Sequence, residues 1–293
     1  MTSLLKSVSP EPITLEEITS KGLPKPATSK LIPFLTAVQK YSTIPFSIFS
    51  FLHLSSVVVA PSLSLIEIGE QLMSMGREIY QVSGFEKILL WSSIAHVLSG
   101  MSLRGIRLYD NYNKYGKVKV KKRRGSRSWK AGQENKETVT DKDEGLGGIL
   151  SILGLGSRKS LSARFLGLSP SSFSGYLLVP MLIYHVIKER IGPWLVDGDS
   201  SFIDLSYISH AIFKNPLKTP VGLVVMVAVA SYHMLSGFNR FMKLFSLRAR
   251  KLTYAAIATT TFLASLSVFF ISKMGPAFGA TARRFDAYDK AVI

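Results

Sequence analysis

Residues 94–104 read IAHVLSGMSLR, and residues 231–240 read SYHMLSGFNR. Each stretch lies inside a long apolar run and carries a His, then Ser-Gly, then an Arg further along. An ionisable side chain is costly inside a membrane, so a histidine repeated in this setting indicates a function. The pattern predicts two related membrane helices, each with a polar group facing the protein interior.

Five apolar runs are long enough to span a bilayer, which takes about 20 residues. They are residues 44–65, 88–108, 173–194, 220–242 and 252–273. Prolines in the first and third runs are tolerated, because neighbouring helices can satisfy the backbone groups that a proline frees. We therefore predict an all-α fold, a polytopic membrane protein with five transmembrane helices.

The composition agrees with this class. The 293-residue chain has no Cys, which excludes disulfides and thiolate metal sites. In a soluble protein a net charge of +17 would suggest nucleic-acid binding. In a chain with long apolar runs, the cations instead indicate how the protein is oriented in the membrane and where it contacts anionic lipids. We expect anionic lipids at the basic loop and no nucleic-acid partner. The chain has none of the common hydrolase or phosphate-loop motifs, so no enzymatic activity is predicted.

The runs divide the chain into five segments. They are a disordered tail (1–40), a first transmembrane helix pair (41–108), a basic loop (109–170), a second helix pair with a fifth helix (171–275) and a C-terminal tail (276–293). Lysines and arginines concentrate in the basic loop and near residue 250, whereas the intervening loops are acidic. The positive-inside rule then places the N-terminus in the cytosol and, with five spans, the C-terminus on the far side.

Each of the first four predicted spans contains one histidine well away from its ends. These are His53, His96, His185 and His233. The spacing indicates a two-helix unit used twice, with the basic loop inserted between the copies. Neutral imidazoles can hydrogen-bond between helices, or two facing imidazoles can hold one haem iron.

Residues near the two quoted histidines bear on this choice. Gly100 and Gly237 each follow a His by one helical turn, where a missing side chain leaves room for a porphyrin. Arg104 and Arg240 lie about two turns from the same histidines, where guanidinium groups could pair with haem propionates.

The predicted spans and their histidines resemble the single-chain, five-span, two-haem cytochrome b anchors of bacterial succinate dehydrogenases and fumarate reductases. In those anchors the histidine of the first helix pairs with that of the third, and the second with the fourth. The resemblance implies a cytochrome b-like four-helix core that binds up to two haem b groups. His53 and His185 would hold one iron, and His96 and His233 the other.

A second resemblance includes the tail. The membrane pattern, the basic loop and a Pro-containing tail are similar to the fungal mitochondrial outer-membrane adaptors of the Mcp type. Those adaptors recruit a bridge-like, vacuolar-sorting-type lipid-transfer protein through a tail motif that ends in Pro-x-Pro. Here the tail reads LLKSVSPEPI, which places Leu5 and Val8 before Pro10 and Pro12 at the expected spacing. A stiff Pro-x-Pro segment can dock with little loss of entropy.

The resemblance implies a multi-pass adaptor of the mitochondrial outer membrane that acts at membrane contact sites in lipid homeostasis. Its N-terminus would be cytosolic, and its C-terminus would lie in the intermembrane space. One alternative is a haem b membrane-anchor subunit for quinone-linked electron transfer. Another is a lipid scramblase-like protein, in which serines line a hydrophilic groove. The serines considered are Ser47, Ser50, Ser55, Ser56, Ser99 and Ser236.

Overall fold

A computed structural model of the chain describes residues 28–115, 162 and 168–292. The described part is all-helical, as predicted. The proposed partner-binding residues of the tail and most of the basic loop lie outside the described residues.

The helices repeat one order of elements. The first half contains α2 (Thr28–Tyr41), α3 (Thr43–Leu54), the π-helical turn η1 (Ser55–Val59), α4 (Ala60–Ser62), α5 (Ile66–Tyr80) and α6 (Ser83–Tyr115). The second half contains α9 (Pro170–Val186), the π-helical turn η2 (Ile187–Ile191), α10 (Gly192–Asp197), α11 (Leu205–Lys214) and α12 (Lys218–Phe241). α13 (Leu247–Ser272) and α14 (Gly279–Ala291) follow. Each half thus has a helix that leads into a π turn, then two further helices and a long helix, and the first half has α2 in addition, ahead of this order.

The π turns have a common cause. η1 comes shortly before Pro61, and η2 shortly before Pro193. Proline has no N–H and cannot bond the carbonyl four residues earlier, so the helix widens locally. Each proline also follows the first histidine of its half, His53 or His185, at the same distance along the chain. The repeat therefore extends to the backbone geometry.

Four helices are long and apolar enough to cross a membrane: residues Lys30–Ser62, Pro170–Asp197, Lys218–Phe241 and Leu247–Ser272. They contain the first, third, fourth and fifth predicted spans. The second predicted span lies in α6, which has 33 residues but is not among these four. Arg104 interrupts its apolar run and lowers its mean hydropathy. Length and composition thus support four of the five predicted spans as candidates, and they do not support the span in α6.

Two boundaries differ from the prediction. Helix α2 begins at Thr28 and continues into the first span, so the segment expected to be disordered up to residue 40 is helical at its end. The C-terminal segment, expected to be a tail, forms α14. Residues Phe285 and Tyr288 of this helix are almost fully buried, which explains why a short polar segment is ordered.

Serines, rather than large apolar side chains, fill much of the space between the long helices. The buried serines include Ser50, Ser56, Ser99, Ser174, Ser231, Ser236 and Ser267. Large apolar residues of α6 such as Trp91, Leu98 and Met101 are instead exposed. Small residues inside and apolar ones outside are typical of helices that pack within lipid.

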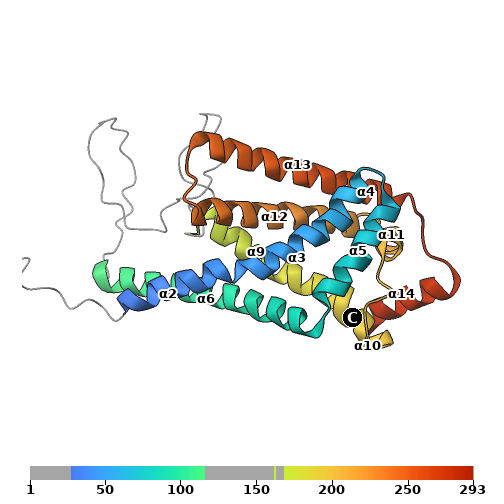
Figure 1. Ribbon diagram of the computed structural model, residues 1–293, viewed down its shortest axis with the longest axis horizontal. Coiled ribbons are helices and arrows are strands. Elements are labelled where there is room, and N and C mark those ends of the chain that lie inside the picture. The colour runs from blue at the N-terminus through green and yellow to red at the C-terminus, as the bar shows by residue number, and fades with distance from the viewer. Residues whose placement is uncertain (1–27, 116–161, 163–167, 293) are drawn as a thin grey trace, which may run out of the picture.

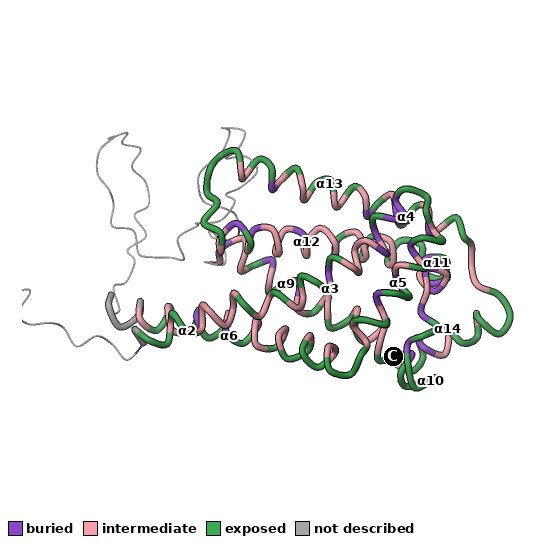
Figure 2. The backbone as a smooth tube through the Cα atoms, viewed as in Figure 1, coloured by how far each residue is buried: buried purple, intermediate pink, exposed green. Residues whose placement is uncertain are grey.

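Figure 1 shows how the long helices are arranged. The start of α2, the end of α6, the start of α9 and the turn between α12 and α13 lie at one end of the bundle. We call this the basic end, because the basic loop leaves from α6 and returns to α9 here. The opposite end holds α4, α5, α10, α11 and α14, and Figure 2 shows many of the buried residues there.

The opposite end has a conventional apolar core. One cluster contains Met73, Leu205, Ile212 and Ile271, and a second contains Ile203, Tyr207, Phe285 and Tyr288. The second cluster fixes α14 against α11. Gly192 allows α14 to approach closely, because an added Cβ there would lie 2.9 Å from the carbonyl oxygen of Tyr288.

Candidate functional site: paired histidines beside a basic cavity

The four membrane histidines meet in two pairs. The ring centroids of His53 and His185 are 6.0 Å apart, and those of His96 and His233 are 6.1 Å apart. The first histidine thus lies opposite the third and the second opposite the fourth, which is the pairing that the resemblance to cytochrome b anchors implied. Because each pair joins equivalent positions of the two halves, the duplication itself brings the rings together.

The spacing of both pairs matches a metal held between two imidazoles. Each metal–nitrogen bond is about 2 Å and each ring centroid lies roughly 1 Å further back, so two axial rings have centroids about 6 Å apart. Among the described residues no group of three or more metal-ligating side chains occurs. A haem iron needs only two axial ligands from the protein, so its requirement differs from that of a bare ion.

The second pair has its rings oriented by the backbone. The Nδ1 atom of His96 lies 2.9 Å from the carbonyl oxygen of Gln39, and that of His233 lies 3.2 Å from the carbonyl oxygen of Ser171. A carbonyl can only accept, so each Nδ1–H donates and each neutral ring keeps a lone pair on Nε2. Metal-ligating histidines usually have such a second bond, so this pair fits an axial ligand pair.

The first pair lacks this support. In the described part of the chain neither His53 nor His185 has a hydrogen-bond partner, and His53 instead stacks on Phe49 at 5.2 Å. The two pairs are therefore alike in separation and differ in how their rings are held. The features that fit a haem group are stronger at His96 and His233.

Gly100 and Gly237 differ in their surroundings, although each follows its histidine by one helical turn in the sequence. The space beside Gly100 is filled by Gln39, whose Nε2 would lie 2.8 Å from an added Cβ. Gly237 has no such neighbour and lines a cavity. Gly175, which the sequence did not single out, lies against His233, because an added Cβ there would be 2.8 Å from the ring Cε1.

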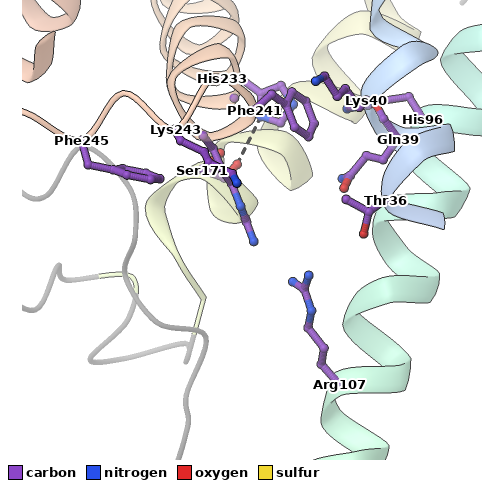
Figure 3. A pocket seen from close by; sticks show the side chains of 12 residues that line it. Thr36, Gln39, Lys40, His96, Arg107, Ser171, His233, Phe241, Lys243 and Phe245 are labelled. Atoms are coloured by element: carbon purple, nitrogen blue, oxygen red, sulfur yellow. Dashed lines mark hydrogen bonds between the residues drawn. The ribbon is translucent and has the colours of Figure 1, made fainter. Parts of the chain in front are cut away.

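The cavity opens beside the second histidine pair at the basic end. Its volume is about 500 Å³. Its lining comes from α2, α6, α9, α12 and the turn after α12 (Figure 3), and consists of Thr36, Gln39, Lys40, His96, Arg107, Ser171, His233, Gly237, Arg240, Phe241, Lys243 and Phe245. Arg240 lines the cavity, as expected for a cofactor contact, but Arg104 does not. Arg107, one helical turn further along α6, takes that place.

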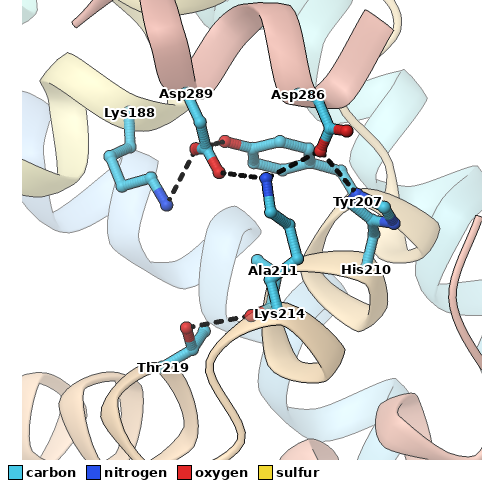
Figure 4. A network of polar contacts seen from close by, with 8 residues as sticks. All are labelled: Lys188, Tyr207, His210, Ala211, Lys214, Thr219, Asp286 and Asp289. Atoms are coloured by element: carbon cyan, nitrogen blue, oxygen red, sulfur yellow. Dashed lines mark hydrogen bonds and ion pairs between the residues drawn. The ribbon is translucent and has the colours of Figure 1, made fainter. Parts of the chain in front are cut away.

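A polar network at the opposite end was not predicted. His210, which lies outside the predicted spans, is buried, and its Nε2 lies 3.1 Å from Asp286 of α14 (Figure 4). Lys214 contacts the same carboxylate at 2.7 Å. The hydrogen bonds from Lys214 and His210 hold the pKa of Asp286 below its usual value. Burial raises the pKa of Tyr207, whose hydroxyl lies 3.4 Å from Asp289. This network ties α14 to α11.

Four of the six serines considered for a hydrophilic groove instead pack inside the protein, whereas Ser47 is exposed and Ser55 is half-buried. Ser50, Ser56, Ser99 and Ser236 are buried between helices. Several of these hydroxyls donate to carbonyls of their own helices, for example Ser56 to His53 at 2.8 Å and Ser99 to His96 at 3.0 Å. Their role in this fold is close helix packing, so the groove that suggested a scramblase has no support from these residues.

Together these features define a class: a polytopic helical membrane protein built from a duplicated helix unit, with histidines paired between the two halves. Residues 180–278 match the family model described as MDM10-complementing protein 1, transmembrane domain. The chain is also 28% identical over 266 residues to the Mitochondrial adapter protein MCP1 of Saccharomyces cerevisiae, which covers 87% of this chain and 82% of that relative. Both matches are to Mcp-type adaptors, and they confirm the resemblance seen in the sequence. No solved structure matches the chain.

Proposed function

We propose that this chain is an adaptor of the mitochondrial outer membrane whose N-terminal tail recruits a bridge-like lipid-transfer protein to contact sites. Through this recruitment it supports mitochondrial lipid homeostasis. The observation that carries the proposal is the similarity to a mitochondrial adapter over 87% of the chain. The similarity supports an adaptor role, and the Pro-x-Pro motif in the tail supports the kind of partner.

We include α6 as a fifth span in this proposal. The first span ends at the opposite end of the bundle, and α9 starts at the basic end, so α6 must return across the same distance (Figure 1). Its 33 residues give a length of about 50 Å, which exceeds the hydrocarbon thickness of about 30 Å. Its outward residues Trp91, Leu98 and Met101 are apolar, as a lipid-facing surface requires.

The orientation follows from this membrane arrangement and the charges. The Lys- and Arg-rich loop is joined to helices of the basic end, while Glu67, Glu70, Asp197 and Asp204 belong to α5, α10 and the start of α11 at the opposite end. With the positive-inside rule the basic end faces the cytosol, and α14 lies in the intermembrane space. The recruiting tail is then on the side from which a partner can approach.

Recruitment is tested with two matched double variants of the tail. Pro10→Ala with Pro12→Ala removes the stiff pair that follows Leu5 and Val8, and it should abolish co-localisation of a bridge-like lipid-transfer protein with mitochondria. Pro24→Ala with Pro26→Ala is the control, because the apolar spacing before that Pro-x-Pro does not fit the motif. Normal recruitment by the Pro10/Pro12 variant would contradict the motif and leave the basic loop as the contact surface.

A second candidate function is binding of haem b by His96 and His233. It is favoured by the 6.1 Å ring separation and by the two Nδ1–H bonds to backbone carbonyls. A bound haem would supply one-electron chemistry. The chain's own residues would hold the two imidazoles in one tautomer, and Gly237 would leave open space beside them. The absorbance spectrum of purified protein, reduced minus oxidised, tests this candidate directly.

A further inference from the structure

The cavity at the basic end is strongly cationic. Lys40, Arg107, Arg240 and Lys243 line it, and no carboxylate from the described residues does so. Arg107 also has another partner in the chain, and the other three cations alone exceed what the two propionates of a haem would need. Arg107 approaches from α6 and Lys243 from the turn after α12, so their side chains enter the space from opposite walls (Figure 3). Such an arrangement surrounds an anion instead of contacting it from one side.

The cavity also lies at the depth of lipid headgroups. A span takes about 20 residues, so in the helix that ends at Ser62 the hydrocarbon part starts near residue 42. Lys40 is just beyond that point, and Arg240 and Lys243 are at the end of the fourth span. Phe241 and Phe245 add apolar surface beside the cations.

We propose that this cavity binds a phosphate ester. Guanidinium and ammonium groups form strong charge-assisted hydrogen bonds with phosphate oxygens, and a phosphomonoester carries more charge than one carboxylate. The ester could belong to an anionic lipid of the surrounding leaflet or to a small soluble molecule. The cavity's depth and its phenylalanines favour the lipid, with the phosphate among the cations and the glycerol beside the rings.

This site does not depend on recruitment of a partner. A haem bound by His96 and His233 would compete for the same cations, because its propionates would bind Arg240 and the cations next to it. The test is therefore made on full-length protein whose haem content has been measured, and the haem-free fraction is expected to bind the ester more tightly.

The experiment measures binding of dioctanoyl phosphatidic acid to the detergent-purified chain by calorimetry. Dioctanoyl phosphatidylcholine and glycerol 3-phosphate are measured alongside, to separate charge from lipid character. The cavity variant is Arg107→Gln with Lys243→Gln. The matched control is Arg248→Gln with Lys251→Gln, which removes the same charge from exposed positions at the same end, outside the cavity.

The Kd for phosphatidic acid should rise about tenfold or more in the cavity variant and stay within about twofold in the control. Equal changes in both variants, or none in either, would overturn the proposal. Glycerol 3-phosphate binding as tightly as phosphatidic acid would overturn the lipid source and assign the cavity to a soluble ester. Should the double variant not fold, Lys243→Gln alone is compared with Lys251→Gln under the same criteria.

Discussion

Ser267 of α13 donates a hydrogen bond of 2.6 Å to the backbone carbonyl oxygen of Val57 in η1. Pro61 is the residue whose N–H would normally bond this carbonyl, and proline has none. Ser267 is 1% exposed, so its hydroxyl takes the place of the missing donor in a buried setting. This hydrogen bond attaches α13 to η1, the turn of the first span in which Pro61 leaves a backbone carbonyl without its usual donor.

Replacing Ser267 with Ala should destabilise the protein. The change leaves the Val57 carbonyl without a partner, which should lower the free energy of unfolding by about 0.5–2 kcal/mol. Ser265→Ala is the control, because its hydroxyl bonds Thr261 in the same helix and is exposed. The measurement is denaturant unfolding of the purified protein in detergent micelles. Equal losses in the two variants would show that the bond to Val57 has no special role.

Gly175→Ala should displace His233. The new Cβ would lie 2.8 Å from the ring Cε1, and the ring is also held by Ser171. We expect an overpacking cost of about 1–3 kcal/mol in the free energy of unfolding. Gly222→Ala, on a helix with nothing within 4 Å, should instead gain up to about 1 kcal/mol from helix propensity. A stabilised Gly175→Ala protein would mean that the ring can move away freely.

Haem binding should depend on one histidine pair more than the other. His96→Ala and His233→Ala should each remove the Soret band of protein expressed with excess haem, because each loses an oriented axial ligand. His53→Ala should retain most of the band, since that ring has no orienting hydrogen bond in the described chain. Loss of the band only in the His53 variant would reverse this assignment, and no band in the unaltered folded protein would exclude haem.

The two termini should differ in access to protease. In intact mitochondria, protease should remove a tag placed before Pro10 and spare one placed after Ile293. This outcome requires five spans, because four would place both ends on the same side. If both tags are removed, α6 does not cross the membrane, and its apolar outer surface needs another explanation.

Docking of α14 should depend on pH at both extremes. Hydrogen bonds from Lys214 and His210 lower the pKa of Asp286 from its usual 3.8, so its stabilising effect is present above 3.8 and is lost as pH falls through the lowered value. The hydrogen bond to Asp286 raises the pKa of Lys214 from 10.5, so that contribution is complete below 10.5 and is lost as pH rises further.

The acid part of this dependence can be measured as the melting temperature of purified protein between about pH 2 and pH 7. The unaltered protein should lose stability at the acid end, and Asp286→Asn should show a weaker loss because the carboxylate is already absent. Lys290→Gln, at the end of the same helix, should follow the unaltered protein. Parallel curves for all three proteins would argue against a role for Asp286.

The sequence predicts those parts of the fold that depend on hydrophobic length. The long helices appear where apolar runs occur, and the histidine spacing indicated a duplicated unit, which agrees with the repeated order of elements. The pairing of His53 with His185 was implied by the resemblance to two-haem cytochrome b anchors, and the structure brings the two rings together. These features depend on patterns that extend over many residues, which is why they can be predicted from the sequence alone.

Features that depend on one helical turn or on docking were not predictable in the same way. Arg104 and Arg107 are both plausible from spacing, and only the direction of α6 decides that Arg107 enters the cavity. Gly100 resembles Gly237 in its local sequence, yet Gln39 from a distant helix occupies its free space. α14 has no long apolar run, and its order depends on Phe285 and Tyr288 meeting a surface formed by other segments.

The length of the first helix has a mechanical consequence. Its 33 residues from Lys30 to Ser62 give about 50 Å, whereas the hydrocarbon layer takes up about 30 Å. α2 therefore extends well past the hydrocarbon boundary at the basic end, where it is braced along its side by α6. This extramembrane part of α2 would set the distance from the membrane at which the tail begins. A partner that binds the tail would then be held at a defined distance from the membrane, and shortening the extramembrane part of α2 would bring this partner closer.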